Sequence, residues 1–543
     1  MTEVAIRPPV SVLAGEPRVL VRRPETRWRR WRVPVWPEGA VVGALVELAA
    51  ALRLPNLGRA YWVDEGISVG VASHHLTQIP GLLRHDGSPP FFYVILHFWL
   101  RAFGGSQIST HILSLLISLV VVVVAWWCAR RLFGPTVAQF AALLAATSPF
   151  LNWYSTETRM YPLLCGLAMV AVTASVCALL RHSTRDFVLA VVTFVALLYT
   201  HNWSLYLFAL TVVGLAAWAF VRGERRDVAW IALGAGIVVV AYLPWLPSFL
   251  YQARHTAAPW AVRPTVGDLF VDPASVLGGT MSLIVAPLFA AAAAATWIWR
   301  TREDNEVTAL IGGIGLATAL AGWVAAQVEP SWTSRYLGVA LGPVLLALAA
   351  CLGGTWIGRR VAAGAVVILV AWSVVGSLLP DSNATYAKSN VAAIAAAARP
   401  FLAPGDLVVV AQSEQVAVLH HYLPPGLRYV TPTGPVADPS VVDWRDLVHR
   451  LQVSSVCSVV EPEIAALPAG AYILLVNPYK HLGASGTTWA RTVNAQVAAV
   501  NDLFANDRGV IDLRVFEQSI SPKPYSAVVG SLFMRSAAPS TCP

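Results

Sequence analysis

The sequence predicts an α-helical polytopic membrane protein of about eleven transmembrane helices, followed by a C-terminal extracytoplasmic α/β domain. Of the 543 residues, 56% are hydrophobic and only 13% are charged, whereas roughly 25% of the residues of an ordinary soluble domain are charged. Most of the chain is therefore expected to have lipid as its solvent. The net charge of +8 does not indicate a nucleic-acid partner, because the basic residues form short clusters between apolar segments.

The apolar segments have the length that crosses a bilayer. A hydrocarbon core of ~30 Å needs roughly 17–25 helical residues, within which every backbone amide must be paired. Segments 187–200 and 203–221 meet at the polar residues Thr200, His201 and Asn202, so they could instead form one bent or re-entrant unit. The expected segments are 38–54, 108–128, 136–153, 161–180, 187–200, 203–221, 228–249, 276–299, 307–327, 336–353 and 361–379.

Arginine clusters alternate with these segments and predict the orientation. Cytoplasmic connections carry an excess of Lys and Arg. The N-terminal segment is rich in arginine, and every second connection after it repeats the signal. We therefore expect a multi-pass protein of the plasma (inner) membrane, with a cytoplasmic N-terminus and with everything after residue 379 outside the cytoplasm. The repeated clusters are Arg130 and Arg131, Arg181 and Arg185, Arg222, Arg225 and Arg226, Arg300 and Arg302, and Arg359 and Arg360.

Three parts follow from these patterns. We expect residues 1–37 to form a cytoplasmic basic segment and residues 38–380 to form the transmembrane domain, with a first outer loop at 56–107. Residues 381–543 have the composition of a soluble domain, in which strand-like and helix-like segments alternate. A small α/β layer fits this alternation.

The C-terminal domain contains two cysteines, Cys457 and Cys542. Its expected location is an oxidising compartment if the cell is a bacterium, and disulfides persist there. We expect a Cys457–Cys542 disulfide that ties down the C-terminal tail, with two free thiols as the alternative. The cysteines show no zinc-binding spacing.

The first outer loop carries the most informative carboxylates. Asp64 and Glu65 follow soon after the first helix, and Asp86 precedes a Pro-Pro turn. Acidic residues at a membrane boundary are costly to bury and are often functional, although a solvated helix end would explain the pair as well. A carboxylate there could accept the proton of a sugar hydroxyl as its oxygen attacks an anomeric carbon. Asp86 could orient the acceptor or the base, or simply cap a turn.

An ordered set of motifs resembles one family. These motifs are the Asp64-Glu65 pair, Ser88 to Tyr93 (Ser-Pro-Pro-Phe-Phe-Tyr), Glu157 to Tyr161 (Glu-Thr-Arg-Met-Tyr), Tyr199-Thr200-His201 and Ser334 to Leu337 (Ser-Arg-Tyr-Leu). Over about residues 38–380 the chain resembles GT-C membrane glycosyltransferases, related to protein O-mannosyltransferases and to the aminoarabinose transferase of lipid A. The C-terminal domain matches these enzymes only in position.

The resemblance implies an inverting transfer from a polyprenyl-phosphate sugar. Asp64 would correspond to the catalytic base, and Glu65 to a second acidic position that holds a nearby cation or helix end. No cofactor is required, and a divalent metal is possible but not predicted. Mannose is favoured as the sugar and arabinose is possible, while the acceptor is a cell-envelope glycan, a glycolipid or a protein.

The leaving phosphate gains negative charge, so fixed hydrogen-bond donors must face it. Arg159 with Tyr161, and Arg335 with Tyr336, each begin a helix at the outer boundary, and His201 lies on the same side. A helix N-terminus adds its own attraction for an anion. Snorkelling to lipid headgroups is the other explanation for each arginine.

A transporter or flippase for a lipid-linked glycan is the alternative function. Transporters often show internal repeats and ionisable residues near the bilayer midplane. The sequence shows neither, and its candidate charges cluster at the outer boundary instead. This placement favours a reaction at the interface.

Overall fold

In a computed structural model of the protein, the described residues are 37–256, 258–277, 301–353, 388–479, 486–517 and 527–542, with single helical positions between 290 and 298 and between 359 and 371. The basic segment 1–37 and the expected transmembrane segments 276–299 and 361–379 lie largely outside these residues. Residues from Glu38 onward form one compact unit.

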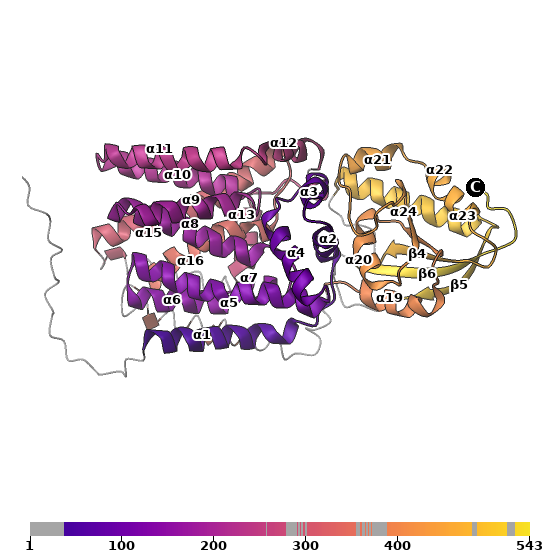
Figure 1. Ribbon diagram of the computed structural model, residues 1–543, viewed down its shortest axis with the longest axis horizontal. Coiled ribbons are helices and arrows are strands. Elements are labelled where there is room, and N and C mark those ends of the chain that lie inside the picture. The colour runs from indigo at the N-terminus through magenta and orange to yellow at the C-terminus, as the bar shows by residue number, and fades with distance from the viewer. Residues whose placement is uncertain are drawn as a thin grey trace, which may run out of the picture. The chain divides into compact units, whose positions relative to one another are not determined.

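Long helices make up the first part of this unit, where neighbouring helices run side by side (Figure 1). The helices α8 and α16 are the most deeply buried of the candidate spans. They pack backbone to backbone, because a Cβ atom at Gly342 would lie 2.7 Å from the carbonyl oxygen of Cys165. The helices are α1 Glu38–Arg53, α5 Gln107–Leu132, α6 Pro135–Thr147, α7 Pro149–Tyr154, α8 Tyr161–Arg181, α9 Thr184–Leu198, α10 Ser204–Val221, α11 Arg225–Tyr242, α12 Leu246–His255, α13 Asp268–Leu277, α15 Arg302–Val328 and α16 Gly338–Gly353.

Five helices in the described part of the chain are long and apolar enough to cross a membrane, or six if α11 and α12 form one span. The expected number of about eleven therefore stays a prediction. The helices α1, α6 and α9 coincide with expected segments but are shorter than a full span. Around Thr200, α9 and α10 are separate helices, as the segment boundaries anticipated.

Prolines break two segments that the sequence analysis treated as continuous. Segment 136–153 divides at Ser148. The Ser148 hydroxyl accepts a hydrogen bond from the backbone amide of Leu151 and so caps α7, and Pro149 lies in the first turn of that helix. Segment 228–249 divides after Tyr242, and α11 and α12 meet at 70°. A proline cannot donate the backbone hydrogen bond that an unbroken helix needs, and Pro244 lies in this second break.

The first outer loop folds into three helices. They are α2 Val63–Ser73, α3 Ile79–Asp86 and α4 Phe91–Phe103, and their apolar faces join the core of the long helices. The helix α2 also packs against α20 Val416–Tyr422 of the C-terminal domain. This loop therefore forms a layer between the long helices and the C-terminal domain.

The C-terminal domain is the expected α/β layer, with a six-stranded sheet in the order β3-β2-β1-β4-β6-β5. Strand β1 is parallel to β2 and β4, and the other pairs are antiparallel. The amphipathic pattern of residues 441–451 predicts a helix over that whole range, but the helix α21 Leu447–Val453 begins only at Leu447. The elements are α19 Val391–Ala398, β1 Leu407–Val410, α20, β2 Arg428–Thr431, β3 Gly434–Pro435, α21 Leu447–Val453, α22 Val456–Val459, α23 Glu461–Ala465, β4 Tyr472–Pro478, α24 Thr488–Asn506, β5 Val510–Phe516 and β6 Val528–Arg535.

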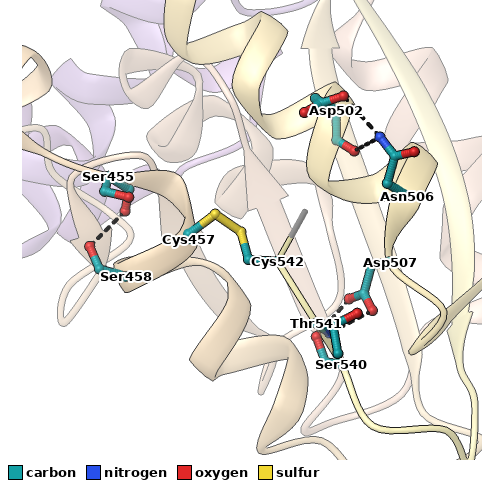
Figure 2. The surroundings of a disulfide bond; sticks show 9 residues. All are labelled: Ser455, Cys457, Ser458, Asp502, Asn506, Asp507, Ser540, Thr541 and Cys542. Carbon is teal, nitrogen blue, oxygen red and sulfur yellow. Dashed lines mark hydrogen bonds between the residues drawn. A yellow bond between two sulfur atoms is a disulfide. The ribbon is translucent and has the colours of Figure 1, made fainter.

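A disulfide joins Cys457 of α22 to Cys542 of the tail, with 5.6 Å between their Cα atoms (Figure 2). This is the pairing expected from the sequence. Asp507 holds the same tail, because its carboxylate accepts hydrogen bonds from the Ser540 hydroxyl (2.6 Å) and the Thr541 amide (3.0 Å). The C-terminal tail is thus fixed to the domain at two points.

Candidate functional site

The two carboxylates of the Asp64-Glu65 pair stand in the first turn of α2. Glu65 Oε2 accepts a long hydrogen bond from the Trp62 backbone amide (3.4 Å) at the start of the helix. Successive positions on a helix are about 100° apart, so the two carboxylates face different surroundings. Both are also stabilised by the positive end of the helix dipole.

Asp64 is paired with two arginines from distant parts of the chain. Its Oδ2 accepts a hydrogen bond from Arg335 Nη1 at 2.8 Å and lies 3.8 Å from Arg159 Nη2. The side chains of Asp64, Arg335 and Arg159 are 18%, 15% and 10% exposed, so water screens these pairs only partly. The structure therefore brings the predicted base together with both predicted phosphate-binding arginines.

Aromatic rings surround the Arg335 guanidinium. The rings of Trp62, Trp260 and Tyr336 have their centroids 5.5, 4.9 and 5.6 Å from its central carbon. Such contacts hold a planar cation without removing its hydrogen-bond donors. Among the described residues, the Nε of Arg335 has no hydrogen-bond partner.

Arg159 is fixed by hydroxyl groups. Its Nη1 donates to Ser68 Oγ at 3.0 Å and to the Tyr93 hydroxyl at 3.2 Å. The ring of Tyr161 lies 5.8 Å from the guanidinium, and Tyr161 itself is fully buried at the start of α8. Tyr161 thus lies beside the Arg159 guanidinium but is itself shut off from solvent.

Glu65 is fully buried and points into a polar cluster. Its Oε1 accepts hydrogen bonds from His111 Nε2 (2.7 Å) and from the backbone amide of Thr158 (2.8 Å), and its Oε2 accepts one from Lys388 Nζ (2.7 Å). Burial alone would raise the pKa of Glu65, but the positive charge of Lys388 and the interactions with His111 lower it to about 2. The carboxylate is therefore ionised and fully engaged.

Lys388 is the partner that sequence reasoning missed. Its Nζ also donates to the Thr156 carbonyl oxygen at 2.7 Å, and its side chain is only 3% exposed. Lys388 thereby links the start of the C-terminal domain to α2 and to the loop before α8. The available signal was its rarity, since it is one of three lysines in the sequence and stands just after the last apolar segment.

Glu157, from the same loop, is a second buried carboxyl group. Its Oε1 accepts a hydrogen bond from Trp153 Nε1 at 2.9 Å, and its Oε2 has no partner among the described residues. Burial raises the pKa of Glu157 to about 7, a shift that the charge of Glu65 reinforces and that of Lys388 opposes. Glu157 is therefore poised to be protonated near neutral pH.

Asp86 ends α3 and faces the same site. Removal from bulk water raises the pKa of Asp86 to about 6, although the nearby charge of Arg159 opposes this shift. A carboxylate with such a pKa is a stronger base than an ordinary aspartate and still ionises near neutral pH.

His201 lies in the turn between α9 and α10. Burial and the charges of Arg159 and Arg335 lower the pKa of His201 to about 3, so the ring is neutral. Its Nδ1 accepts a hydrogen bond from the backbone amide of Trp203 at 3.1 Å, so the proton of the neutral ring is on Nε2. His201 can therefore donate a hydrogen bond but adds no positive charge to the phosphate-binding group.

A cavity of about 400 Å³ joins these residues. Glu65 and Tyr161 lie outside its lining, and the remaining predicted residues border it, namely Asp64, Asp86, Arg159, His201, Arg335 and Tyr336. A cavity of this size suits one or two sugar rings with a phosphate.

The cavity also has walls that the sequence did not predict. Gln252 of α12 and Trp260 border it, and Trp444 comes from the C-terminal domain. The backbone amide of Trp444 donates to the His85 carbonyl oxygen at 3.1 Å. Tryptophans are typical of membrane interfaces, and only the tertiary structure brings Trp444 to the cavity.

Known proteins share this fold. ArnT from Cupriavidus metallidurans bound to undecaprenyl phosphate is similar with a TM-score of 0.57 and 14% identity over 92% of this chain and 98% of that one. The apo form of ArnT is similar with a TM-score of 0.56 and 17% identity, over 91% of this chain and 98% of that one. A third similar structure is the oligosaccharyltransferase AglB from Archaeoglobus fulgidus in complex with an inhibitory peptide and a dolichol-phosphate. Its TM-score is 0.50 with 11% identity, over 81% of this chain and 69% of that one. No curated protein matches the sequence.

The chain has the GT-C fold, as its ordered motifs indicated. Residues 87–247 match the model of the dolichyl-phosphate-mannose-protein mannosyltransferase family. This match starts one residue after Asp86 and includes Arg159 and His201. Asp64 and Arg335 lie outside it, and their assignment to the site comes from the geometry.

Proposed function

We propose that this protein is an inverting glycosyltransferase that moves a sugar from a polyprenyl-phosphate donor to a cell-envelope acceptor at the outer face of the membrane. The observation that carries the proposal is the contact of the Asp64 carboxylate with both Arg159 and Arg335 on the wall of one cavity. A base and a phosphate-binding pair within one cavity are the parts that this reaction needs.

The arginines would bind the donor phosphate. Guanidinium groups match phosphate oxygens in geometry and in charge, and the Nε of each arginine has no partner among the described residues. A bound phosphate would compete with Asp64 for Arg335 and would thereby free the carboxylate. Donor binding would in this way prepare the base.

Transfer would then proceed by direct displacement. The oxygen of the acceptor hydroxyl attacks the anomeric carbon, and the bond from that carbon to the phosphate oxygen breaks. The polyprenyl phosphate leaves with the electron pair, and Asp64 takes the proton of the acceptor hydroxyl. Asp86 would orient the acceptor from the same cavity lining, and Glu65 would hold the first turn of α2 through Lys388.

We propose no resident metal for this step. Arg159 and Arg335 already supply positive charge where the leaving phosphate becomes more negative. We also propose that the protein lies in the plasma (inner) membrane with its N-terminus in the cytoplasm. The alternating arginine clusters support this orientation, and a disulfide in the C-terminal domain suits an oxidising compartment.

Mannose is the favoured sugar and arabinose is the alternative. The match of residues 87–247 to a mannosyltransferase family supports mannose. The acceptor would be a glycan, a glycolipid or a protein. The bound lipid phosphates of the ArnT and AglB structures support a polyprenyl-phosphate donor for this chain as well.

The test uses purified protein in nanodiscs with polyprenyl-phosphate mannose or polyprenyl-phosphate arabinofuranose labelled in the sugar. Transfer to a short glycan, with the anomeric configuration of the product read by NMR, should show inversion. Movement of the labelled lipid across a vesicle bilayer without any new glycosidic bond would instead favour the flippase alternative.

A further inference from the structure

One wall of the cavity is supplied by the C-terminal domain. Trp444 borders the cavity and packs against the core of the long helices as well as that of the C-terminal domain. Trp260 borders the same cavity and also packs against the C-terminal core. The two indoles therefore stand where the two parts of the protein meet, which is a common place for ligand sites.

The segment that carries Trp444 is firmly anchored. The Asp438 carboxylate accepts a hydrogen bond from His74 Nε2 at 2.8 Å, and the Asp446 carboxylate lies 3.1 Å from His255 Nδ1. Between them, the backbone carbonyl group of Ser440 packs so closely against Gly70 that no Cβ atom would fit there. Trp444 is therefore held by contacts on both sides along the chain, so its ring is a built part of the cavity wall.

The chemistry of this wall suits a neutral sugar ring. Indole faces pack against the C–H faces of sugars, and both tryptophans are only half-buried. Three further residues of the cavity lining, Gln252, Thr256 and Ser331, are polar and uncharged.

Charge argues against an anionic ligand on this wall. Within the lining of this cavity the cationic side chains are Arg159 and Arg335, which both face Asp64, and the Arg335 guanidinium also lies over the ring of Trp260 at 4.9 Å. Two further carboxylates, Asp86 and Glu329, leave the lining with an excess of acidic groups. A second phosphate or a carboxylate on the acceptor would have to compete with Asp64 and with the donor phosphate for these two arginines.

We propose that Trp444 and Trp260 form a subsite for a neutral sugar ring of the acceptor, so that the acceptor is a glycan or glycolipid without charge next to the reacting hydroxyl. This assignment rests on the proposed transferase function. It gives the C-terminal domain a direct part in acceptor recognition.

The experiment compares wild type with Trp444→Ala, Trp444→Phe and a control, Tyr479→Ala, which removes an exposed aromatic ring of the same domain outside the cavity lining. Full-length protein in nanodiscs receives polyprenyl-phosphate mannose and either octyl α-mannobioside or the same acceptor carrying a phosphate group. We expect Trp444→Ala to raise the acceptor KM roughly tenfold or more, with partial recovery in Trp444→Phe. Donor binding and the Tyr479→Ala variant should match wild type.

An unchanged acceptor KM in folded Trp444→Ala would overturn the proposal. A loss confined to donor binding would overturn the acceptor assignment, because the wall would then hold the donor sugar. Preference for the phosphorylated acceptor would overturn the neutral class. Saturation-transfer NMR with methyl α-mannoside tests the subsite without turnover. A signal that Trp444→Ala abolishes, in a protein that transfers no sugar, would keep the subsite and refute the transferase function.

Discussion

Replacing Lys388 with methionine should destabilise the protein far more than an ordinary loss of an ion pair. Lys388 is the cation that faces the buried Glu65 carboxylate, with side chains 3% and 0% exposed. The substitution keeps most of the side-chain volume, but within the described part of the chain it leaves Glu65 Oε2 with only the long contact from Trp62. Removing one partner of a buried pair typically costs ~3–5 kcal/mol, because the remaining charge stays out of water.

The matched control is Arg428→Met. Arg428 pairs with Glu463 in the same domain, but those side chains are 44% and 23% exposed. Exposed pairs contribute about 0–1 kcal/mol. Thermal unfolding in detergent, followed by intrinsic fluorescence, should therefore show a large fall in Tm for Lys388→Met and little change for Arg428→Met.

Neutralising the partner should rescue the loss. The double variant Glu65→Gln with Lys388→Met removes the stranded charge, so it should be more stable than Lys388→Met alone. Lower pH should help the single variant as well, because Glu65 without Lys388 protonates more readily. If Lys388→Met unfolds at the same temperature as Arg428→Met, the buried pair does not join the two parts of the protein, and this account of Glu65 is wrong.

Three further predictions concern the donor, the pH profile and the tail. Arg335→Ala should weaken donor binding and turnover together, which titration with labelled donor and initial rates would measure; intact donor binding would speak against a phosphate contact. If Asp86 must be ionised, kcat/KM in wild type should fall below about pH 6, following the raised pKa of Asp86, and Asp86→Asn should remove that acid limb; a limb that persists would assign it to another group. Cys457→Ala should lower stability by ~2–5 kcal/mol and release the tail to proteolysis, whereas an unchanged protease pattern would show that the Asp507 contacts suffice.

Hydropathy patterns within short stretches of the sequence predicted most of the individual helices and strands. The length of the apolar segments predicted the long helices, and short continuous apolar runs predicted the buried strands around Leu407 and Tyr472. The breaks at Ser148 and Tyr242 were missed, although the adjacent prolines were visible, because a window of hydropathy does not register one lost hydrogen bond. The disulfide was predictable because two cysteines stood alone in the soluble part.

The site was predictable only to the extent that its residues belong to recognisable motifs. Asp64 and Arg335 are far apart in the sequence, and the order of the motifs was the only sign that they meet. Lys388 and Trp444 belong to no such motif, and each reaches the site through long-range packing of the C-terminal domain. The pKa of Asp86 likewise depends on burial by distant segments, which no local pattern reveals.

The most direct test of the central claim is the turnover of Asp64→Asn with labelled polyprenyl-phosphate mannose and a glycan acceptor. The amide keeps the shape of the side chain but lacks the basic oxygen, so turnover should fall by ~10²–10⁴-fold while donor binding survives. Folded yield and donor affinity must be measured on the same preparation, because a substitution beside Arg335 can also act through stability. Near-normal turnover in this variant would contradict the account, since Asp64 would then be only a helix-end charge.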